Sequence, residues 1–280
     1  MKYFITGATG SIGRLIVKQL VEQKAEVIAM CRVPEKSNLP KEVRVVKGDL
    51  TDGNFDKRIF EGVETLFLFP AEGDMRPFLR TAKEAGVEHV IALSSLAVSA
   101  HFQRDQDSAS YIHHLAIENS VREVGFKLTA LRPGTFATNL LAWSPTIKMT
   151  KSVFLPFPDS AQAPIHEADI AECVVALFDK PAKWGKVYEL SGPKALTQRE
   201  QVEKLGQALG VSLNCHRVTP EQFTSSVSQF MSDEIIKMIL TYWEETTLQP
   251  DIIRTGYTEL TGNPGRTFEQ WAGDHVGQFR

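Results

Sequence analysis

Several features are scarce in this chain of 280 residues, and each scarcity argues against a class of protein. Its three cysteines, Cys31, Cys173 and Cys215, are odd in number and far apart, which indicates neither a disulfide framework nor a zinc site. No apolar run reaches about 18 residues, so no transmembrane helix is expected. The first residues have the pattern of a strand rather than of a charged and then apolar leader. We therefore expect a reduced, cytoplasmic protein without a metal ion or a membrane contact.

Charge of one sign is not in excess either. The chain has 31 Lys and Arg against 34 Asp and Glu, which gives a formal net charge of −3. Proteins that bind nucleic acid usually carry a basic stripe, so no nucleic-acid partner is expected. What the composition does favour is an ordinary globular protein, with 42% hydrophobic and 23% charged residues.

Short apolar segments alternate with helical ones along the first two thirds of the chain. Strands are predicted at residues 2–6, 26–31, 43–47, 63–69, 90–93, 127–131 and 186–190. Helices are predicted to start within residues 7–13 and to cover 55–61, 76–85, 111–124 and 166–180. Nearly unbroken apolar strands are typical of a parallel sheet that is buried on both faces.

The pattern changes beyond Gly192. Three helices are predicted at residues 197–209, 220–230 and 233–245 without strands between them, and prolines interrupt residues 144–158. We predict an α/β protein with a Rossmann-type, doubly wound parallel sheet and a smaller, mostly helical C-terminal lobe. The nucleotide-binding domain would comprise residues 1–135 and 165–192, and the substrate lobe residues 136–164 and 193–280.

A glycine-rich segment, Gly-Ala-Thr-Gly-Ser-Ile-Gly at residues 7–13, connects the first strand to the first helix. Gly7, Gly10 and Gly13 allow a sharp turn and let a pyrophosphate approach the backbone and the N–H groups at the helix start. Thr9, Ser11 and Ile12 are expected to add contacts. The alternative is a glycine-rich turn that binds no ligand.

The end of the second strand bears on which dinucleotide is bound. NAD sites place a carboxylate there to bind the ribose 2′-hydroxyl, but this strand ends in Ala-Met-Cys-Arg. The guanidinium of Arg32 suits a 2′-phosphate, with Arg14 and Lys36 adding positive potential, so the predicted cofactor is NADP(H). Asp49 and Leu50, after the third strand, are expected to lie beside the adenine. Arg32 could instead be a solvated loop residue.

These motifs and several others resemble those of atypical short-chain dehydrogenases/reductases with NmrA-like members, over essentially the whole chain. The shared motifs are the glycine segment, Gly-Asp-Leu-Thr-Asp at 48–52, Ala-Gly-Val at 85–87, Leu-Arg-Pro-Gly at 131–134, Ile-His-Glu-Ala-Asp-Ile-Ala at 165–171 and Gly-Lys-Val-Tyr-Glu-Leu-Ser-Gly at 185–192. Within this group the sequence resembles NADPH-dependent quinone oxidoreductases of the second type and triphenylmethane reductases. The resemblance implies NADPH-dependent reduction of small molecules.

The catalytic residues of ordinary short-chain dehydrogenases are incomplete here. Those enzymes use a serine and a tyrosine whose pKa is lowered by a lysine four residues later. Tyr111 is placed for that role, but Leu115 stands where the lysine would be, and Ser94 or Ser95 would supply the serine. The resemblance marks His114 as recurrent. Tyr111, His114 and Ser94 are therefore the candidate catalytic residues, although hydride transfer to an activated electrophile needs little acid.

Other histidines are interpreted structurally. His101 begins a polar stretch, residues 101–110, that is expected to be a mobile loop over the site. His166 and Asp169 form an attractive pair, but the favoured role is structural, with Asp169 near the positive end of a helix dipole. His216 and His275 carry no signal.

The remaining predicted site residues follow the fourth and sixth strands. Cofactor contacts are expected from Phe69, Pro70, Pro133, Gly134 and Phe136. The resemblance places residues 136–143 beside the nicotinamide, so Phe136, Leu140 and Trp143 are candidate walls for a flat, conjugated small-molecule substrate. Plain core packing is the alternative for each of them. Apolar residues of the C-terminal helices, from Phe223 to Trp243, could line the pocket or a homodimer surface, and the chain could equally be a monomer.

Three functions remain open from the sequence. The favoured one is NADPH-dependent reduction of a quinone, enone or similar electrophile. The others are an NADP(H)-sensing regulator without turnover and a dedicated biosynthetic reductase or isomerase.

Overall fold

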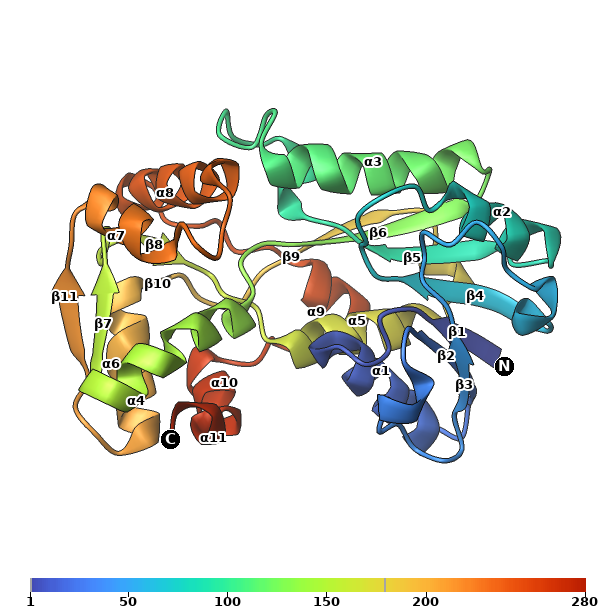
Figure 1. Ribbon diagram of the computed structural model, residues 1–280, viewed down its shortest axis with the longest axis horizontal. Coiled ribbons are helices and arrows are strands. Elements are labelled where there is room, and N and C mark those ends of the chain that lie inside the picture. The colour runs from blue at the N-terminus through green and yellow to red at the C-terminus, as the bar shows by residue number, and fades with distance from the viewer. Residues whose placement is uncertain (1, 179) are drawn as a thin grey trace.

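The computed structural model describes residues 2–178 and 180–280, which form two lobes (Figure 1). The larger lobe contains a seven-stranded parallel sheet with the strand order β3-β2-β1-β4-β5-β6-β9. Its strands are β1 (Lys2–Ile5), β2 (Glu26–Cys31), β3 (Arg44–Lys47), β4 (Val63–Leu68), β5 (His89–Leu93), β6 (Lys127–Pro133) and β9 (Val187–Leu190). The predicted Rossmann-type sheet is thus confirmed.

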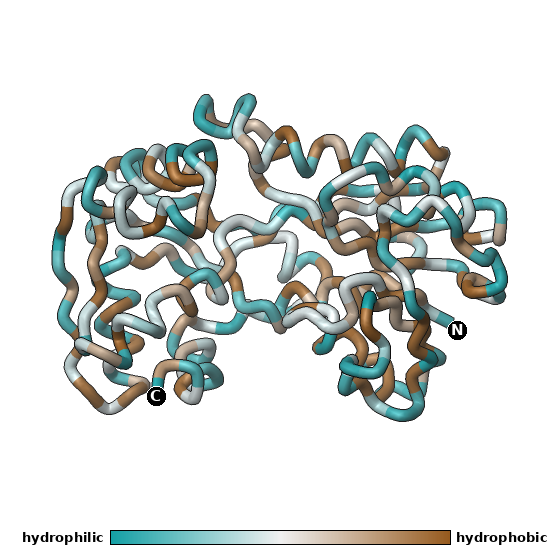
Figure 2. Tube along the Cα trace, in the orientation of Figure 1, coloured by the Kyte–Doolittle hydropathy of each residue, from teal (hydrophilic) through white to brown (hydrophobic). Residues whose placement is uncertain are grey.

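Helices cover both faces of this sheet because its strands are apolar on both sides. Tyr3 and Ile5 point into one hydrophobic cluster, whereas Phe4, between them, points into the other. The helices of the first cluster are α1 (Ser11–Glu22), α5 (Glu167–Phe178) and α9 (Gly256–Thr261), and those of the second are α2 (Arg76–Glu84) and α3 (Ala109–Glu123). In Figure 2 brown, apolar stretches run along the central strands, and the loop before α3 is teal.

The order of the strands fixes where a ligand can bind. The chain leaves β1 toward β2 on one side and later returns to β4 on the other, so the connections reverse direction at β1. Ligands of open parallel sheets bind at the carboxyl ends of the strands at such a point. The carboxyl end of β6 also leads directly into the smaller lobe (Figure 1).

The smaller lobe has its own hydrophobic cluster, which includes Ile147, Leu155, Leu205 and Trp271. Its elements are α4 (Ser144–Thr150), β7 (Ser152–Leu155), β8 (Ala161–Gln162), β10 (Leu196–Thr197), α6 (Gln198–Leu209), β11 (Asn214–Arg217), α7 (Pro220–Val227), α8 (Asp233–Leu248), α10 (Phe268–Asp274) and α11 (Val276–Phe279). Short 3-10 helices connect the elements: η1 (Pro34–Lys36), η2 (Lys57–Phe60), η3 (Leu96–Ser99), η4 (Ala137–Trp143) and η5 (Pro181–Lys183).

Two details of the predicted secondary structure are wrong. The segment between α6 and α7 contains β11, which pairs in parallel with β7 although its sequence, Asn-Cys-His-Arg, has no apolar alternation. The predicted helix at 55–61 is the 3-10 helix η2, because the segment between its capping residue Asp56 and Gly62 is too short for a stable α-helix. Residue 179, in the predicted helix 166–180, lies outside the described residues.

One helix of the predicted substrate lobe packs against the larger lobe. Helix α9 belongs to the range 193–280, yet Tyr257 and Leu260 pack into the first cluster of the larger lobe. Among residues 2–178 and 180–280, no helix is long and apolar enough to cross a membrane.

Candidate functional site

A side chain would have different consequences at each of the three glycines of the loop. Gly7 has a φ of +61°, and a Cβ on it would lie 2.7 Å from the Phe69 side chain. A Cβ on Gly13 would lie 2.2 Å from the Gly7 carbonyl oxygen, so helix and loop could not pack as they do. A Cβ on Gly10 would meet only that same oxygen, at 3.4 Å. The protein itself therefore requires Gly7 and Gly13, whereas the open space at Gly10 suits a ligand.

The start of α1 is built to receive an anion. Gly10 is the N-cap residue, and no side chain of the described residues caps this end of the helix. The N–H groups of the first helical turn have no acceptor inside the helix, so they point toward the space next to Gly10. Arg14 lies beside the loop, donating from Nε to the Thr9 carbonyl oxygen at 2.9 Å and from a terminal nitrogen to the Asn38 carbonyl oxygen at 3.3 Å. This cradle fits a pyrophosphate.

The residue that follows β2 is a cation, Arg32. Arg32 is exposed and makes no hydrogen bond or ion pair within the described part of the chain. Asp49 accepts hydrogen bonds from the Thr51 N–H and hydroxyl at 3.1 and 3.0 Å, which lower its pKa, and the Arg32 charge adds to that shift. Leu50 is buried in the second cluster. The guanidinium is therefore free for a phosphate on the β2 side of the sheet.

One buried hydroxyl, which the sequence did not indicate, fixes the switch point. Thr6 follows β1 and donates to the Phe67 carbonyl oxygen at 3.0 Å, and it accepts from the Phe69 N–H at 2.7 Å. It thereby ties the carboxyl ends of β1 and β4 together. Phe69 and Pro70 are half-buried beside it, where a bound dinucleotide would cross from one half of the sheet to the other.

Helix α3 carries two of the three predicted catalytic residues. Ser108 caps its start by accepting from the Tyr111 N–H at 3.1 Å, and the half-buried Tyr111 hydroxyl has no hydrogen-bond partner among residues 2–178 and 180–280. Burial, with a smaller effect of the neighbouring His113, lowers the pKa of His114 to about 4. The buried Nδ1 of His114 is also without a partner in the described chain. At neutral pH His114 is therefore an uncharged imidazole.

The third candidate, Ser94, is engaged in a buried ionic cluster that the sequence analysis missed. Glu118 on α3 is completely buried and accepts from Ser94 at 2.7 Å, from Arg132 at 2.8 Å to each oxygen, and from Arg122 at 2.6 Å. Burial alone would raise the pKa of Glu118, but these hydrogen bonds outweigh it and lower the pKa. The cluster fixes α3 against β5 and β6, so the geometry favours a structural role for Ser94.

The polar loop at residues 101–108 is attached to other elements at two points. His101 lies 2.6 Å from Glu189. The Arg104 side chain is only 8% exposed and pairs with Glu245 of α8 at 2.5 Å. Its guanidinium lies over the rings of Phe102, at 4.1 Å, and Tyr242, at 5.1 Å. The loop thus connects the larger lobe to α8 of the smaller one.

The segment after β6 combines cofactor and substrate candidates. Pro133 ends the strand, the Gly134 N–H donates to the Leu190 carbonyl oxygen at 2.9 Å, and Phe136 packs partly on the first cluster. Leu140 is 8% exposed in the core of the smaller lobe, and Trp143 packs against that core. For Leu140 the structure favours the alternative of core packing over a substrate wall.

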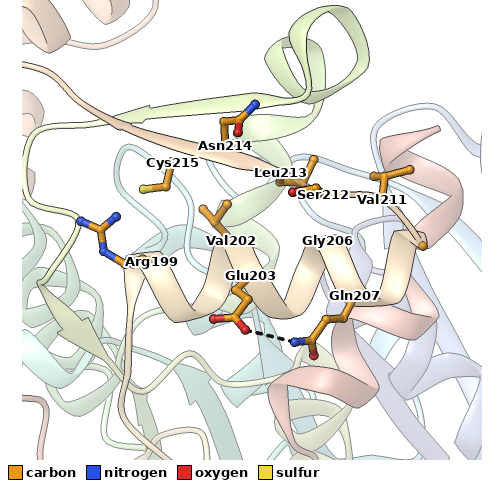
Figure 3. Close-up of a pocket in the computed structure, with 11 residues that line it drawn as sticks. Arg199, Val202, Glu203, Gly206, Gln207, Val211, Ser212, Leu213, Asn214 and Cys215 are labelled. Atoms are coloured by element: carbon orange, nitrogen blue, oxygen red, sulfur yellow. Dashed lines mark hydrogen bonds between the residues drawn. The ribbon is translucent and has the colours of Figure 1, made fainter.

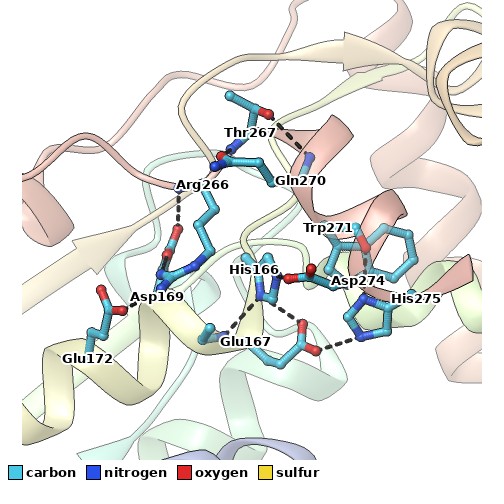
Figure 4. A network of polar contacts seen from close by, with 11 residues as sticks. His166, Glu167, Asp169, Glu172, Arg266, Thr267, Gln270, Trp271, Asp274 and His275 are labelled. Carbon is cyan, nitrogen blue, oxygen red and sulfur yellow. Dashed lines mark hydrogen bonds and ion pairs between the residues drawn. The ribbon is translucent and has the colours of Figure 1, made fainter. Parts of the chain in front are cut away.

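Helix α5 is joined to the C-terminal segment by a network of charged groups (Figure 4). His166 caps the helix by accepting from the Ala168 N–H at 3.1 Å, and its Nε2 lies 3.3 Å from Asp274. His275 donates to the Trp271 carbonyl oxygen at 2.8 Å and lies 2.7 Å from Glu167. Burial would lower the pKa of His275, but these contacts raise it. This raised pKa belongs to a histidine for which no sequence signal was found.

The second half of this network supports the structural interpretation of Asp169. Asp169 accepts from the Arg266 N–H at 2.8 Å and forms an ion pair with its guanidinium, which also contacts Glu172 at 2.5 Å. Burial raises the pKa of Asp169 despite Arg266. Its negative charge lies in the first turn of α5, as predicted, and its long-range partner is Arg266.

A surface pocket lies elsewhere, in the smaller lobe between α6 and β11 (Figure 3). It is lined by Arg199, Val202, Glu203, Gly206, Gln207, Gly210, Val211, Ser212, Leu213, Asn214 and Cys215. No predicted site residue lines it. This pocket is therefore separate from the candidate site at the carboxyl edge of the large sheet.

Together, the parallel sheet with its reversal at β1 and the glycine loop before α1 place the protein in the class of Rossmann-type folds. Within that class the chain belongs to the NmrA-like family, whose model matches residues 2–270. The resemblance indicated by the sequence motifs is thus confirmed.

Individual relatives cover nearly the whole chain. The (4-alkanoyl-5-oxo-2,5-dihydrofuran-3-yl)methyl phosphate reductase of Streptomyces griseus is 30% identical, and the NAD(P)H azoreductase of Xenophilus azovorans is 28% identical, each over 98% of both chains. Among solved structures, a new type of NADPH-dependent quinone oxidoreductase from Escherichia coli superposes with a TM-score of 0.79 at 23% identity, over 97% of this chain and 98% of that one. This last similarity concerns the fold.

Proposed function

We propose that the protein is an NADP(H)-dependent oxidoreductase that transfers a hydride to a small conjugated electrophile, such as a quinone or an enone. The observation that carries the cofactor assignment is the combination of open space at Gly10 with an exposed cation after β2, Arg32, which has no partner among residues 2–178 and 180–280. Two similar relatives are named as reductases of unsaturated compounds, an oxo-dihydrofuran and an azo compound, which supports the reaction class.

Different residues would bind different parts of the cofactor. The first turn of α1 and the space at Gly10 would hold the pyrophosphate, and Arg32 would hold the 2′-phosphate, with Asp49 and Leu50 near the adenine. The other predicted contacts, at the ends of β4 and β6, would lie on the nicotinamide side of the switch point; they are Phe69, Pro70, Pro133, Gly134 and Phe136. Bound NADPH would supply the hydride.

The chemistry of α3 favours an electrophile that needs little acid catalysis. Leu115 stands in place of a lysine, so Tyr111 and the residue four positions later cannot form the usual tyrosine–lysine couple. An uncharged His114 can hydrogen-bond a substrate oxygen but is a much weaker acid than an imidazolium. Catalysis would then depend on holding a conjugated acceptor face to face with the nicotinamide. Phe136 and Trp143 remain candidates for that wall.

A panel assay tests the proposal. NADPH oxidation is followed with quinones, enones and azo compounds, with Gly10→Val as the control that should bind no dinucleotide. Turnover of at least one acceptor by the wild type alone supports the proposal. Tight NADPH binding without turnover of any acceptor would contradict it and would favour the dinucleotide-sensing regulator.

A further inference from the structure

Three side chains form a hydrogen-bonded chain between the lobes, and none of them serves the functions assigned above. The Tyr242 hydroxyl on α8 donates to Oδ2 of Asp251 at 2.5 Å and lies 2.9 Å from Oγ1 of Thr135. Asp251 also accepts from the Ala163 N–H, at 3.1 Å. Thr135 directly follows Pro133 and Gly134 at the carboxyl end of β6.

The donor and the acceptor of each hydrogen bond among these three side chains can be assigned by counting protons. A carboxylate accepts hydrogen bonds only, so the single hydroxyl proton of Tyr242 is committed to Asp251. Burial and the Asp251 charge raise the pKa of Tyr242 well above its ordinary value, so the hydroxyl stays protonated. The Tyr242 oxygen must therefore accept, and the Thr135 hydroxyl must donate to it. The remaining lone pairs of Thr135 are left as acceptors.

The hydrogen-bonded chain of Thr135, Tyr242 and Asp251 is held in place at its middle residue, Tyr242. The Tyr242 ring carries the Arg104 guanidinium on its face, and Arg104 is fixed by its ion pair with Glu245 one turn further along α8. The backbone of Thr135 is fixed as well, because its carbonyl oxygen accepts from the Ile165 N–H at 2.9 Å. The Thr135 side chain is half-buried and lies on the β4–β6 half of the sheet, where the nicotinamide half of a dinucleotide belongs.

We propose that Thr135 binds the carboxamide NH₂ group of the nicotinamide through Oγ1, and that Tyr242 is the positioning residue that accepts the Thr135 proton and so turns a lone pair of Oγ1 toward that group. This inference rests on the proposed cofactor. It specifies which end of the carboxamide faces β6, and hence how the ring is rotated in the site. It also means that α8, in the smaller lobe, contributes to holding the nicotinamide without touching it.

Calorimetric titration with three ligands tests this without any turnover. The ligands are NADP⁺, its 3-acetylpyridine analogue, in which a methyl ketone replaces the carboxamide, and 2′-phospho-ADP-ribose, which has no nicotinamide. Thr135→Val should weaken NADP⁺ binding by about 3- to 10-fold, the range for one net hydrogen bond, and leave the other two ligands unchanged. Thr135→Ser should restore NADP⁺ binding.

Tyr242→Phe separates positioning from packing, since it keeps the ring under Arg104 and removes only the hydroxyl. It should weaken NADP⁺ binding while 2′-phospho-ADP-ribose binds as before. Equal losses for all three ligands, or no loss for any in Thr135→Val, would overturn the inference while leaving the proposed function standing. A wild-type protein that binds neither NADP⁺ nor 2′-phospho-ADP-ribose would overturn both.

Discussion

Replacing Arg32 by alanine should convert a protein that prefers NADPH into one that hardly distinguishes it from NADH. A charge-assisted hydrogen bond is worth roughly 1.5–3 kcal/mol, or about 10- to 150-fold in affinity. Arg32 is exposed, so solvent and salt screen its charge, and Asp49 lies close enough to offset part of it. We therefore expect the lower part of that range, about 10- to 30-fold weaker NADPH binding, with NADH binding almost unchanged.

Calorimetric titration of both cofactors at low and at moderate salt measures this difference. Arg44→Ala is the matched control, because Arg44 is also an exposed arginine but lies at the amino end of its strand, β3, away from the carboxyl ends where the cofactor would bind. Its NADPH affinity should equal that of the wild type. Equal losses for NADPH and NADH in Arg32→Ala, or an equal loss of NADPH affinity in the control, would refute the assignment of the 2′-phosphate to Arg32.

Three further outcomes are expected. Gly10→Val should keep a wild-type circular dichroism spectrum, because a Cβ there meets only one oxygen, at 3.4 Å. The variant should nevertheless lose dinucleotide binding. Retained micromolar NADPH affinity would mean that the cofactor does not use the loop. Tyr111→Phe should lower kcat by less than about 10-fold in steady-state assays. Loss of a working general acid costs about 10²–10⁴-fold in kcat. A fall of about 10³-fold would therefore identify Tyr111 as the acid. The raised pKa of His275 means that its contacts with Glu167 stabilise the fold fully below its ordinary value of 6.5 and are lost as the pH rises through the folded-state value. In urea titrations His275→Gln should therefore lose more unfolding free energy at about pH 6 than at about pH 9, and equal losses at both would show that His275 is uncharged when folded.

The sheet could be predicted because its information is local. Each strand is a short apolar run. Consecutive residues such as Phe4 and Ile5 pack on opposite faces of the sheet, so an unbroken apolar run indicates a strand that is buried on both faces. The glycine loop is equally local, since Gly7 and Gly13 contact residues within the loop or directly after a neighbouring strand. Strand β11 was missed because its stability comes from pairing with β7, about sixty residues earlier in the chain.

Most of the polar framework around the site could not be predicted, because its partners are distant in sequence. Glu118 looks like an ordinary helix-surface residue until Arg132 and Ser94 are placed around it. Arg104 and Tyr242 come from a polar loop and a C-terminal helix, and nothing in either segment indicates the other. Single-sequence reasoning finds the chemistry of short motifs, whereas contacts between lobes require the fold.

The most direct test of the central claim is a single-turnover measurement of hydride transfer. Protein loaded with NADPH that carries deuterium on one face of nicotinamide C4 is mixed with a conjugated acceptor, and oxidation of the bound cofactor is followed. The proposed function predicts slower oxidation with one labelled diastereomer and an unchanged rate with the other, because only one face of the held ring is used. No oxidation by any conjugated acceptor, or equal rates with both diastereomers and with unlabelled NADPH, would contradict it.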